Sequence, residues 1–287
     1  MKSKTVLITG GAGFIGSNLC ERYLSLGYSV TSIDNYFTGF TNNHIDGVRY
    51  YNGDVMFINE IFKNKKFDIV FHLGEYSRVE TSFDDIDIVI RNNSFGIVEV
   101  LEYCRKFGSK LIYAGSSTKY GDIGPSSSPY AYTKAKNTEL VKNYGEWFGL
   151  DYAITYFYNV YGKREISKGK YATFIAKCKH AAKTGDEIPI VLPGTQKRNF
   201  THIDDVIDGL VLVANKGYGD EHGIGSSEQY SVLEVAKIFG CNIKYIKPRK
   251  GNRMGSEVVT DKTLELGWKP KRTLKDYVEN ETHCMHA

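Results

Sequence analysis

Hydrophobic and polar positions follow two kinds of pattern along the first 160 residues. Short apolar runs rich in β-branched residues, such as Lys-Thr-Val-Leu-Ile-Thr at 4–9, predict buried strands. Longer stretches between them carry apolar residues every three or four positions, which predicts helices packed by one face. We expect strands at 4–9, 29–33, 48–51, 68–72, 110–115 and 151–157, and helices at 14–26, 55–64, 85–107 and 130–148.

This alternation of strands and helices predicts the fold class. Strands joined by helical crossovers form a parallel sheet, and the helices cover both of its faces. We therefore predict an α/β protein whose residues 1–162 form a Rossmann-type, doubly wound parallel sheet. Right-handed crossovers would bring the functional residues together at the carboxyl ends of the strands.

Beyond residue 162 the pattern is less regular. Helical stretches at 171–184, 204–216, 231–239 and 273–281 are separated by loops rich in Gly, Lys and Asn. We interpret residues 163–287 as a smaller substrate-binding lobe interleaved with the first domain, with an approximate boundary.

Composition excludes several classes of protein. Of the 287 residues, 41% are hydrophobic and 24% are charged, as in globular proteins, and no apolar run approaches the roughly 20 residues that span a bilayer. The net charge of +4 is too small to indicate a nucleic-acid partner. Five scattered cysteines without a Cys-x-x-Cys pair, and an N-terminus that leads straight into a strand, favour a cytoplasmic protein without a signal peptide. We expect no metal site.

Three glycines mark the turn from the first strand into the first helix. Gly10, Gly13 and Gly16 have the spacing that permits a tight turn and close approach of the main chain to a pyrophosphate. The N-terminus of the following helix offers unpaired N–H groups to the phosphates. Because a strand precedes the turn and a helix follows it, a dinucleotide site is favoured over a glycine-rich turn without a ligand.

Asp34 stands at the end of the second strand, about 20 residues further on. A carboxylate there can accept hydrogen bonds from both hydroxyls of the adenosine ribose and would repel a 2′-phosphate. No Arg or Lys follows it immediately, since Asn35 and Tyr36 come next. The sequence therefore favours NAD over NADP as the cofactor.

Tyr130 and Lys134 are four residues apart in a predicted helix, so they share one face. A neighbouring ammonium group favours the phenolate and lowers the pKa of a tyrosine from its usual value of about 10. Such a phenol can accept a proton from a sugar or alcohol hydroxyl. The spacing alone is weak, because such pairs also occur by chance on ordinary helices.

Together these motifs resemble the extended short-chain dehydrogenase/reductase family, specifically its NAD-dependent nucleotide-sugar epimerases and dehydratases. The resemblance runs from about residue 4 to residue 281, with the motifs in the family's order. They are Gly10-x-x-Gly13-x-x-Gly16, Asp34-Asn35, Gly53-Asp54-Val55, His72-Leu73, Asn93-x-x-Gly96, Ser116-Ser-Thr-Lys-Tyr-Gly121, Tyr130-x-x-x-Lys134, Asn159-Val-Tyr-Gly162, Arg198-Asn-Phe-Thr-His-Ile-Asp-Asp205 and Leu266-Gly-Trp-Lys-Pro270.

The resemblance implies roles for individual residues. Tyr130 would be the acid/base, Lys134 would bind the nicotinamide ribose, and Ser116, followed by Thr118, would hydrogen-bond the reacting hydroxyl. Asn159 would contact the nucleotide sugar and Arg198 its diphosphate, with Arg249 or Arg253 as a loosely aligned further contact. Cofactor contacts would come from Gly10, Gly13, Phe14, Ile15, Gly16, Asp34, Asn35, Asp54, Val55, Leu73, Asn93 and Lys134.

Arg78 admits two interpretations. It lies in the segment after the fourth strand, which approaches the sugar in relatives, so it could pair with a uronate carboxylate. It could also form a surface ion pair with Glu75 or Glu80, and we favour this second interpretation.

The residues after Ser116 bear on the type of reaction. Relatives that catalyse 4,6-dehydration resemble Thr-Asp-Glu at this point, whereas this chain has Ser116, Ser117 and Thr118. Two hydroxyl groups cannot replace a carboxylate pair as acid and base at pH 7. We therefore favour a nucleotide-sugar 4-epimerase that works through a transient 4-keto intermediate.

Other functions stay open. A nucleotide-sugar reductase or 4-oxidase would use the same tyrosine and lysine, a 4,6-dehydratase ranks third, and a catalytically idle NAD-binding scaffold is the alternative outside enzymes. By analogy with relatives we expect a homodimer packed through helices 85–107 and 130–148. The loop at 122–129 is about half the length usual in the family, which leaves the sugar undetermined.

Overall fold

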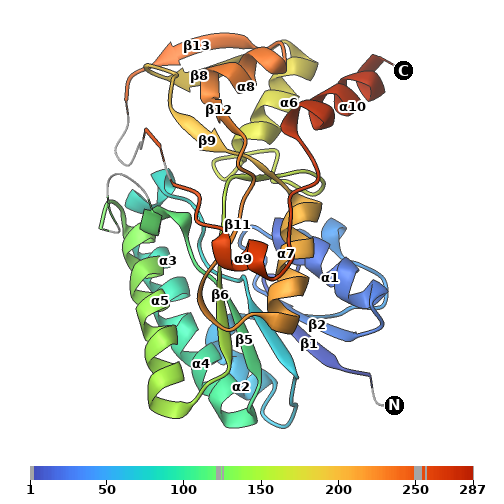
Figure 1. The fold of residues 1–287 in the computed structure, drawn as a ribbon, viewed down its shortest axis with the longest axis vertical. Coiled ribbons are helices and arrows are strands. Elements are labelled where there is room, and N and C mark those ends of the chain that lie inside the picture. The colour runs from blue at the N-terminus through green and yellow to red at the C-terminus, as the bar shows by residue number, and fades with distance from the viewer. Residues whose placement is uncertain (1–2, 121–123, 125, 249–253, 256, 287) are drawn as a thin grey trace.

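A seven-stranded parallel sheet forms the centre of the computed structural model, which describes residues 3–286 except 121–123, 125, 249–253 and 256 (Figure 1). The strand order is β11-β6-β5-β4-β1-β2-β3. The chain proceeds outward from β1 in one direction and then, from β4, in the other, so the order reverses between β1 and β4. The predicted doubly wound α/β fold is confirmed. The strands are β1 (Thr5–Thr9), β2 (Ser29–Asp34), β3 (Arg49–Asn52), β4 (Ile69–His72), β5 (Lys110–Ala114), β6 (Tyr152–Phe157) and β11 (Gly219–Ile224).

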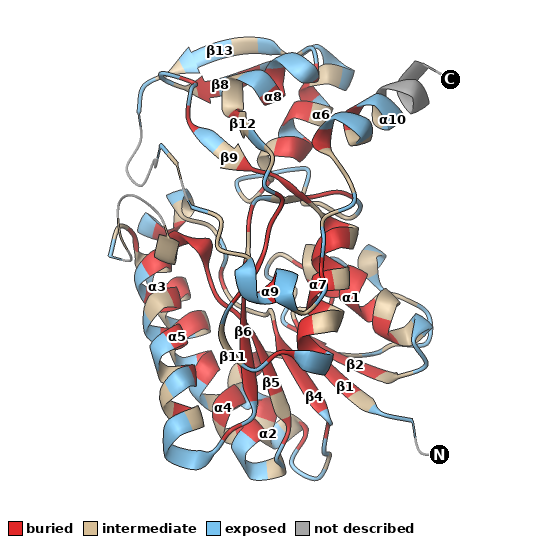
Figure 2. Ribbon diagram, in the orientation of Figure 1, coloured by how far each residue is buried: buried red, intermediate tan, exposed pale blue. Residues whose placement is uncertain are grey.

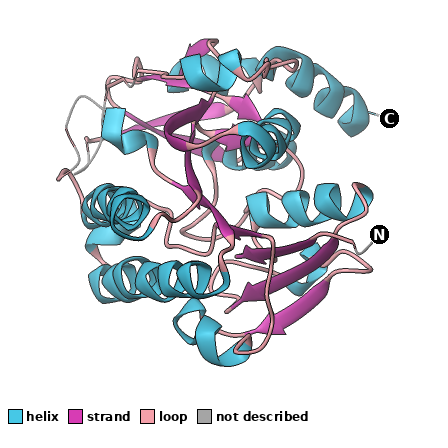
Figure 3. Ribbon diagram, turned by 60° about the horizontal axis from the view of Figure 1, so that its bottom comes forward, coloured by secondary structure: helices cyan, strands magenta, loops and turns pink. Residues whose placement is uncertain are grey.

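Helices cover both faces of this sheet, as Figure 3 shows. In β1, Val6 and Ile8 face the core shared with α1 (Phe14–Ser25) and α7 (Ile203–Lys216). Leu7 faces the opposite core, which contains residues of α2 (Ile58–Ile61), α4 (Gly96–Phe107) and α5 (Pro129–Phe148). Because both faces of the strand are buried, its sequence is continuously apolar rather than alternating.

The ends of the helices follow local sequence signals. The Ser128 hydroxyl accepts a hydrogen bond from the Ala131 amide and Pro129 occupies the first turn, which fixes the start of α5. Gly149, in the left-handed conformation, ends this helix, and Gly108 ends α4 in the same way.

The helix predicted at 85–107 is not continuous. It consists of α3 (Ile86–Val89), a π-helical segment η4 (Ile90–Phe95) and α4. The π-helical segment carries Asn93, whose side chain accepts a hydrogen bond from the Tyr76 amide at 2.8 Å and donates one to the Thr133 hydroxyl at 3.1 Å. The helix predicted at 55–64 is shorter than expected, because it forms only η2 (Val55–Phe57) and α2.

The strand β11 was missed by the sequence analysis, which treated Gly219–Ile224 as a loop. It pairs in parallel with β6 at the edge of the sheet and has a register shift between Gly219 and His222. Its sequence, Gly-Asp-Glu-His-Gly-Ile, lacks an apolar run because only its last three residues are buried. Edge strands tolerate such polar residues, so their pattern is weak.

A second group of elements forms the smaller lobe at the top of Figure 1. Two strand pairs, β8 (Glu187–Val191) with β13 (Asn242–Ile246) and β9 (Lys197–Asn199) with β12 (Gln229–Ser231), were wrongly predicted as loops. They were missed because each is short and half exposed. Apolar side chains of β8, β12 and β13 pack with α6 (Phe174–Thr184), α8 (Val232–Ile238) and α10 (Leu274–His286) into a separate core, visible as buried residues in Figure 2.

The two parts of the chain are interleaved. After α6, β8 and β9, the chain returns through α7 and β11 to the large sheet, and it then re-enters the lobe through β12. A short pairing of β7 (Val160–Tyr161) with β10 (Thr201–His202), also missed, lies between the two parts. None of the helices that the structure describes has the length and apolarity needed to cross a membrane.

Asp205 of α7 anchors the C-terminal segment to the large domain. Its side chain is 1% exposed and accepts hydrogen bonds from the amides of Lys271 and Arg272, both at 3.0 Å. It also pairs with the Arg272 guanidinium at 2.7 Å, and its carbonyl oxygen accepts a hydrogen bond from the Trp268 indole. One buried carboxylate therefore holds the connection between α9 (Asp261–Glu265) and α10.

We expect Asp205→Asn to lower the free energy of unfolding by about 2–3 kcal/mol, because the amide group cannot accept all these hydrogen bonds and leaves buried N–H groups unpaired. Urea denaturation followed by circular dichroism measures this change. The control is Asp208→Asn in the same helix, where the side chain is 27% exposed and its ion pairs with Arg22 and Lys271 contribute less than about 1 kcal/mol. Equal effects of the two substitutions would contradict this account.

Candidate active site

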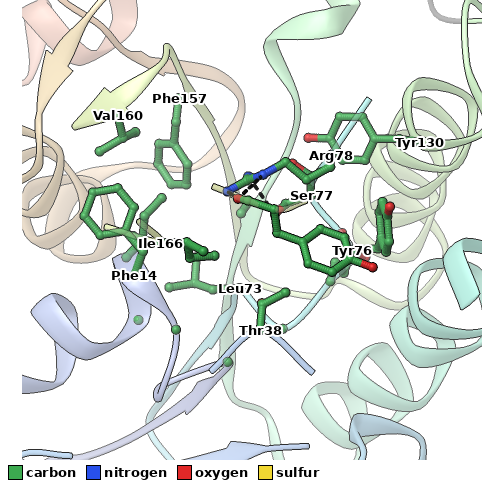
Figure 4. Close-up of a pocket in the computed structure, with 18 of the residues that line it drawn as sticks. Phe14, Thr38, Leu73, Tyr76, Ser77, Arg78, Tyr130, Phe157, Val160 and Ile166 are labelled. Carbon is green, nitrogen blue, oxygen red and sulfur yellow. Dashed lines mark hydrogen bonds between the residues drawn. The ribbon is translucent and has the colours of Figure 1, made fainter. Parts of the chain in front are cut away.

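A cavity of about 560 Å³ opens at the carboxyl ends of the parallel strands, where the strand order reverses. Figure 4 shows apolar Phe14, Leu73, Phe157, Val160 and Ile166 on one side, with Tyr76, Ser77, Arg78 and Tyr130 on the other. Such a crevice is the usual ligand site of a doubly wound sheet. Most of the residues predicted from the sequence line it: Gly10, Gly13, Phe14, Ile15, Gly16, Asp34, Asn35, Asp54, Val55, Leu73, Arg78, Ser116, Thr118, Tyr130, Lys134 and Asn159.

The glycine turn brings main chain to the floor of the cavity. Gly10 has a φ of 72°, and a Cβ added there would lie 2.9 Å from the Cα of Gly74. A Cβ on Gly16 would overlap the Gly10 carbonyl oxygen. Gly13 caps α1 without any side-chain hydrogen bond, so the first amides of the helix are available to a ligand. The turn therefore fits a pyrophosphate.

Asp34 lies at the end of β2 and is held by two amides. Its Oδ2 accepts from Ala12 N at 2.9 Å and its Oδ1 from Tyr36 N at 2.8 Å. Burial raises the pKa of Asp34, while these amides act in the opposite direction. The remaining lone pairs can accept hydrogen bonds from ribose hydroxyls. Together, the glycine turn and this carboxylate fit NAD.

Asp54 and Asn35 lie beside each other on the same rim of the cavity. The Asn35 amide nitrogen donates to Asp54 Oδ2 at 3.2 Å, and Asp54 Oδ1 caps η2 by accepting from Met56 N. Val55 follows and is buried. These positions are consistent with the expected adenine contacts, whose roles stay predictions.

The start of α5 places Tyr130 in the first turn of the helix and Lys134 one turn later, both lining the cavity. The Lys134 ammonium donates to the Ala114 carbonyl oxygen at the end of β5 and to Glu75 Oε2. Its nitrogen also lies 4.8 Å from the centre of the Tyr113 ring. Within the described part of the chain, no hydrogen bond is made by the Tyr130 hydroxyl, which leaves it available to a ligand.

Ser116 follows β5 at the base of the same cavity. The Thr118 hydroxyl donates to Ser116 Oγ at 2.9 Å, and the Thr118 amide approaches the same oxygen at 3.3 Å. Because Ser116 Oγ accepts these bonds, its own proton can be donated to a ligand. Thr118 belongs to the short helix η5 (Ser117–Tyr120), which begins directly after Ser116.

Glu75 is a cavity residue that the sequence analysis missed, since it was considered only as a surface partner of Arg78. Its side chain is 2% exposed and pairs with Lys134. Burial alone would raise the pKa of Glu75, but the charge of Lys134 and the His72 ring outweigh burial and lower the pKa to about 2. The only sequence signal was its place just after a strand that ends in His72.

Arg78 lies in the cavity wall, and the predicted surface ion pair is wrong. The Arg78 Nε and Nη2 atoms donate to the Tyr171 carbonyl oxygen at 2.9 and 2.7 Å, and Nη1 donates to the Ser77 carbonyl oxygen at 3.1 Å. Glu75 faces Lys134 instead. Burial lowers the pKa of Arg78.

Of five further predicted residues, the structure places only Asn159 at the cavity. Asn159 lines the cavity, although its amide donates to the Asn199 carbonyl oxygen at 2.8 Å. Asn93 and Arg198 do not line it: Asn93 holds the main chain of Tyr76, and Arg198 donates to the carbonyl oxygens of its neighbour Lys197 and of Met254. Arg249 and Arg253 lie outside the described residues. The assigned roles of all these residues stay predictions.

Comparison with known proteins agrees with this geometry. Residues 6–227 match the model of the NAD dependent epimerase/dehydratase family. A putative UDP-glucose 4-epimerase of Methanocaldococcus jannaschii is 30% identical, with 98% of each chain covered. A UDP-N-acetyl-alpha-D-glucosaminuronate decarboxylase of Bacillus cytotoxicus is 31% identical, with 82% of this chain and 78% of the relative covered. The crystal structure of a Bacillus cereus UDP-glucuronic acid 4-epimerase, in complex with UDP-glucuronic acid and NAD, has a TM-score of 0.87 at 26% identity and covers 98% of this chain and 99% of its own.

We expect Asp34→Asn to weaken NADH binding by a factor of about ten or more, because hydrogen bonds from ribose hydroxyls to a charged acceptor are lost. Binding of NADPH should weaken less or improve, since the negative charge that repels a 2′-phosphate is gone. Fluorescence titration with both dinucleotides measures the two affinities. Asp54→Asn, on the same rim, should leave the preference for NADH over NADPH unchanged; a preference unaltered by Asp34→Asn would contradict the assignment.

Proposed function

Because the chain belongs to the NAD-dependent epimerase/dehydratase family, whose members are enzymes with NAD as cofactor, we propose that it is a nucleotide-sugar 4-epimerase. The family includes epimerases, decarboxylases and dehydratases at similar identity to this chain, so membership leaves the reaction open. The choice among these reactions rests on the groups around Ser116 and Tyr130.

The observation that carries the proposal is the pair of hydroxyls at Ser116 and Thr118. A 4,6-dehydratase needs an acid to protonate the leaving hydroxyl and a base to take a carbon-bound proton. Here the two positions after Ser116 hold Ser117 and Thr118, and Thr118 donates its hydrogen bond to Ser116. The carboxylate of Glu75 is bound to Lys134, which makes it a poor proton donor.

In the proposed reaction, Tyr130 removes the proton of the sugar 4-hydroxyl while Ser116 hydrogen-bonds the same oxygen. NAD, which the glycine turn and Asp34 would hold, would supply the hydride acceptor and donor for this reaction. Lys134, held by Ala114 and Glu75, can use its third N–H to bind a ribose hydroxyl. Tyr130 then gives its proton back to the oxygen of the transient 4-ketone.

The sugar end of the cavity supports a turn of the ketone between two orientations. Phe157, Phe174 and Phe200 line the cavity wall, and aromatic faces impose fewer fixed hydrogen bonds than polar side chains. We propose that Asn159, Arg198 and the basic residues Arg249 and Arg253 bind the nucleotide, while the sugar makes few fixed hydrogen bonds. Arg78 is the proposed sugar contact.

Two further proposals follow from the fold. Residues 1–162 are proposed to bind NAD and residues 163–287 the nucleotide sugar, with α7 and β11 of the second part completing the first. The four described cysteines, Cys20, Cys104, Cys178 and Cys241, are free thiols, which favours a cytoplasmic location.

Product analysis tests the type of reaction. The full-length protein is incubated with UDP-, GDP-, CDP- and dTDP-sugars, including a UDP-uronate, and the products are identified by proton NMR. We expect a C4 epimer without any net change in nicotinamide absorbance. Stoichiometric use of the nicotinamide would identify a reductase or oxidase instead, a 4-keto-6-deoxy product would identify a dehydratase, and NAD binding without turnover would identify a scaffold.

We expect Tyr130→Phe to lower kcat by a factor of about 10²–10⁴, because the acid/base is lost, while NAD binding is retained. Tyr132→Phe, two residues along the same helix and 48% exposed, is the control and should keep full activity. Initial rates and dinucleotide titrations measure both quantities. Undiminished turnover in Tyr130→Phe would refute this assignment of the base.

The expected homodimer also stays a proposal, which exposed apolar side chains on the predicted helices support. Phe95 is 61% exposed at the start of α4, and Trp147 is 59% exposed at the end of α5. Burying such side chains against a second copy would be favourable.

Light scattering after size exclusion should therefore give twice the chain mass of 32.4 kDa. Phe95→Asp should shift this mass to that of a single chain, because a charge would be buried in the contact. Tyr218→Asp, on an exposed position beside the sheet edge, should leave it unchanged. A wild-type protein of single-chain mass would disprove the dimer.

A further inference from the structure

Lys134 forms an ion pair with a carboxylate, which reduces the effect of its positive charge on neighbouring groups. The side chains of Lys134 and Glu75 are 6% and 2% exposed, and they form a direct ion pair. At such a buried site, the field of one charge is largely offset by that of its partner. The net electrostatic effect of the pair on Tyr130 is therefore small, although the sequence led us to expect that Lys134 lowers the pKa of Tyr130.

The position of Glu75 is fixed by the main chain on both sides of it. Before it, Gly74 approaches the glycine turn so closely that an added Cβ would lie 2.9 Å from Thr9 Oγ1. After it, Asn93 binds both the amide and the carbonyl oxygen of Tyr76. The Glu75 side chain is thus buried among the residues that line the cavity and does not extend into solvent.

Side chains from three elements face the Glu75 carboxylate, and all of them donate to it or carry a proton toward it. From α5, Lys134 reaches Oε2 and the Asn137 amide donates to Oε1 at 2.9 Å. From β5, the Tyr113 hydroxyl donates to Oε2 at 3.0 Å. From β4, His72 Nε2 lies 3.4 Å from Oε1, at a poor angle for a hydrogen bond.

The proton on His72 can be placed from its other neighbour. Thr9 Oγ1 accepts hydrogen bonds from the amides of Leu73 and Gly74 at 3.1 and 2.9 Å, so its own proton points to His72 Nδ1, 2.8 Å away. Nδ1 is then the acceptor, and the neutral ring carries its proton on Nε2, facing Glu75. This arrangement keeps the carboxylate ionised without adding a second positive charge.

Arg78 is the second cation at the cavity, which it lines on the same side as Tyr130 (Figure 4), and it lacks such compensation. Its guanidinium donates to oxygens of Tyr171 and Ser77, and among the described residues no carboxylate forms an ion pair with it. The carboxyl group of Glu165 also interacts with Arg78. Burial raises the pKa of Glu165 to about 8, so this group is mostly protonated at neutral pH.

We propose that Glu75 is a positioning residue that holds the Lys134 ammonium in place and cancels its charge, so that Arg78 provides the positive charge that Tyr130 experiences. The proposal rests on Tyr130 as the acid/base of the proposed function. It divides two tasks between two cations: Lys134 orients, and Arg78 stabilises the phenolate. Glu75 thereby sets the pH at which Tyr130 loses its proton.

The test is a titration of Tyr130 in a double-substitution cycle. Tyrosinate absorbance at about 295 nm is followed with pH on the full-length protein saturated with NAD⁺ and as purified, each as a difference against the same variant carrying Tyr130→Phe. Glu75→Gln leaves Lys134 uncompensated and should lower the pKa of Tyr130 by about one unit. Lys134→Met leaves Glu75 uncompensated and should raise it by about as much.

The double variant Glu75→Gln/Lys134→Met removes a neutral pair, so the Tyr130 titration should return to within about 0.3 units of the wild type. Arg78→Met should raise the pKa of Tyr130, and Arg78→Lys should restore it. A double variant that titrates like Lys134→Met alone would overturn the proposal, and so would an unchanged Tyr130 in Glu75→Gln or Arg78→Met.

Two controls separate charge from structure. Tyr113→Phe removes a hydrogen bond to the same carboxylate but no charge, so Tyr130 should titrate as in the wild type; a shift as large as that of Glu75→Gln would make the effect structural and refute the proposal. Glu75→Asp keeps the charge and should also titrate as the wild type. Should Glu75→Gln fail to fold, the Arg78 pair and Lys134→Met still decide the question.

The readout is absorbance rather than turnover, which keeps the two hypotheses apart. If no nucleotide sugar is converted but the pKa of Tyr130 shifts in the single variants and returns in the double variant as expected, the proposed function fails and the role of Glu75 stands. If sugars are epimerised but the pKa of Tyr130 is the same in Glu75→Gln as in the wild type, the function stands and the role of Glu75 is refuted. In active protein, the acid limb of kcat/KM should move to lower pH in Glu75→Gln, because the phenolate then forms at lower pH.

Discussion

The site depends on the close approach of two strand ends at the point where the sheet reverses its order. Gly10 after β1 and Gly74 after β4 lie so near each other that neither position has room for a side chain. This contact brings the glycine turn, the segment from His72 to Arg78 and the start of α5 around one crevice. The residues expected to bind the dinucleotide and those proposed for the acid/base chemistry therefore share a single constraint on the main chain, and neither group can be altered locally without displacing the other.

The same constraint explains why so many charges are buried together. Taking Glu75 and Lys134 out of water costs free energy that their attraction repays only when the remaining donors and acceptors are also satisfied. Here Ala114, Tyr113 and Asn137 complete the set. Such a pair adds little net stability compared with an apolar pair of the same shape, so its presence under a ligand cavity points to a functional reason. Orientation of the Lys134 ammonium is one such reason, since a flexible lysine stem is otherwise poorly ordered.

The sequence predicted the parts of this protein whose signal is local. Strand β1, the turn at Gly10–Gly16, Asp34 and the pair Tyr130/Lys134 each follow from neighbours within a few residues. The structure places the three glycines of the turn, Asp34, Tyr130 and Lys134 at the cavity. Strand β11 could not be predicted, because its stability comes from pairing with β6 about 65 residues away rather than from its own polar sequence. Glu75 was misjudged for a similar reason: its partners Tyr113, Lys134 and Asn137 come from distant elements, and only the fold brings them together. Arg78 looked like a surface residue because the Tyr171 carbonyl that binds it lies 93 positions further along the chain.

Relatives with this fold differ in reaction, so the fold itself cannot choose among epimerisation, dehydration and decarboxylation. The choice lies in which groups near the sugar can exchange protons and what charge surrounds them. In this chain the strand end after β5 offers hydroxyls, and the buried carboxylate of Glu75 at the cavity forms an ion pair with Lys134. In the proposed reaction, Tyr130 is the group that exchanges a proton with the sugar hydroxyl. One such group is sufficient for a reaction that removes and returns a proton at the same oxygen, whereas loss of a hydroxyl group would require a second.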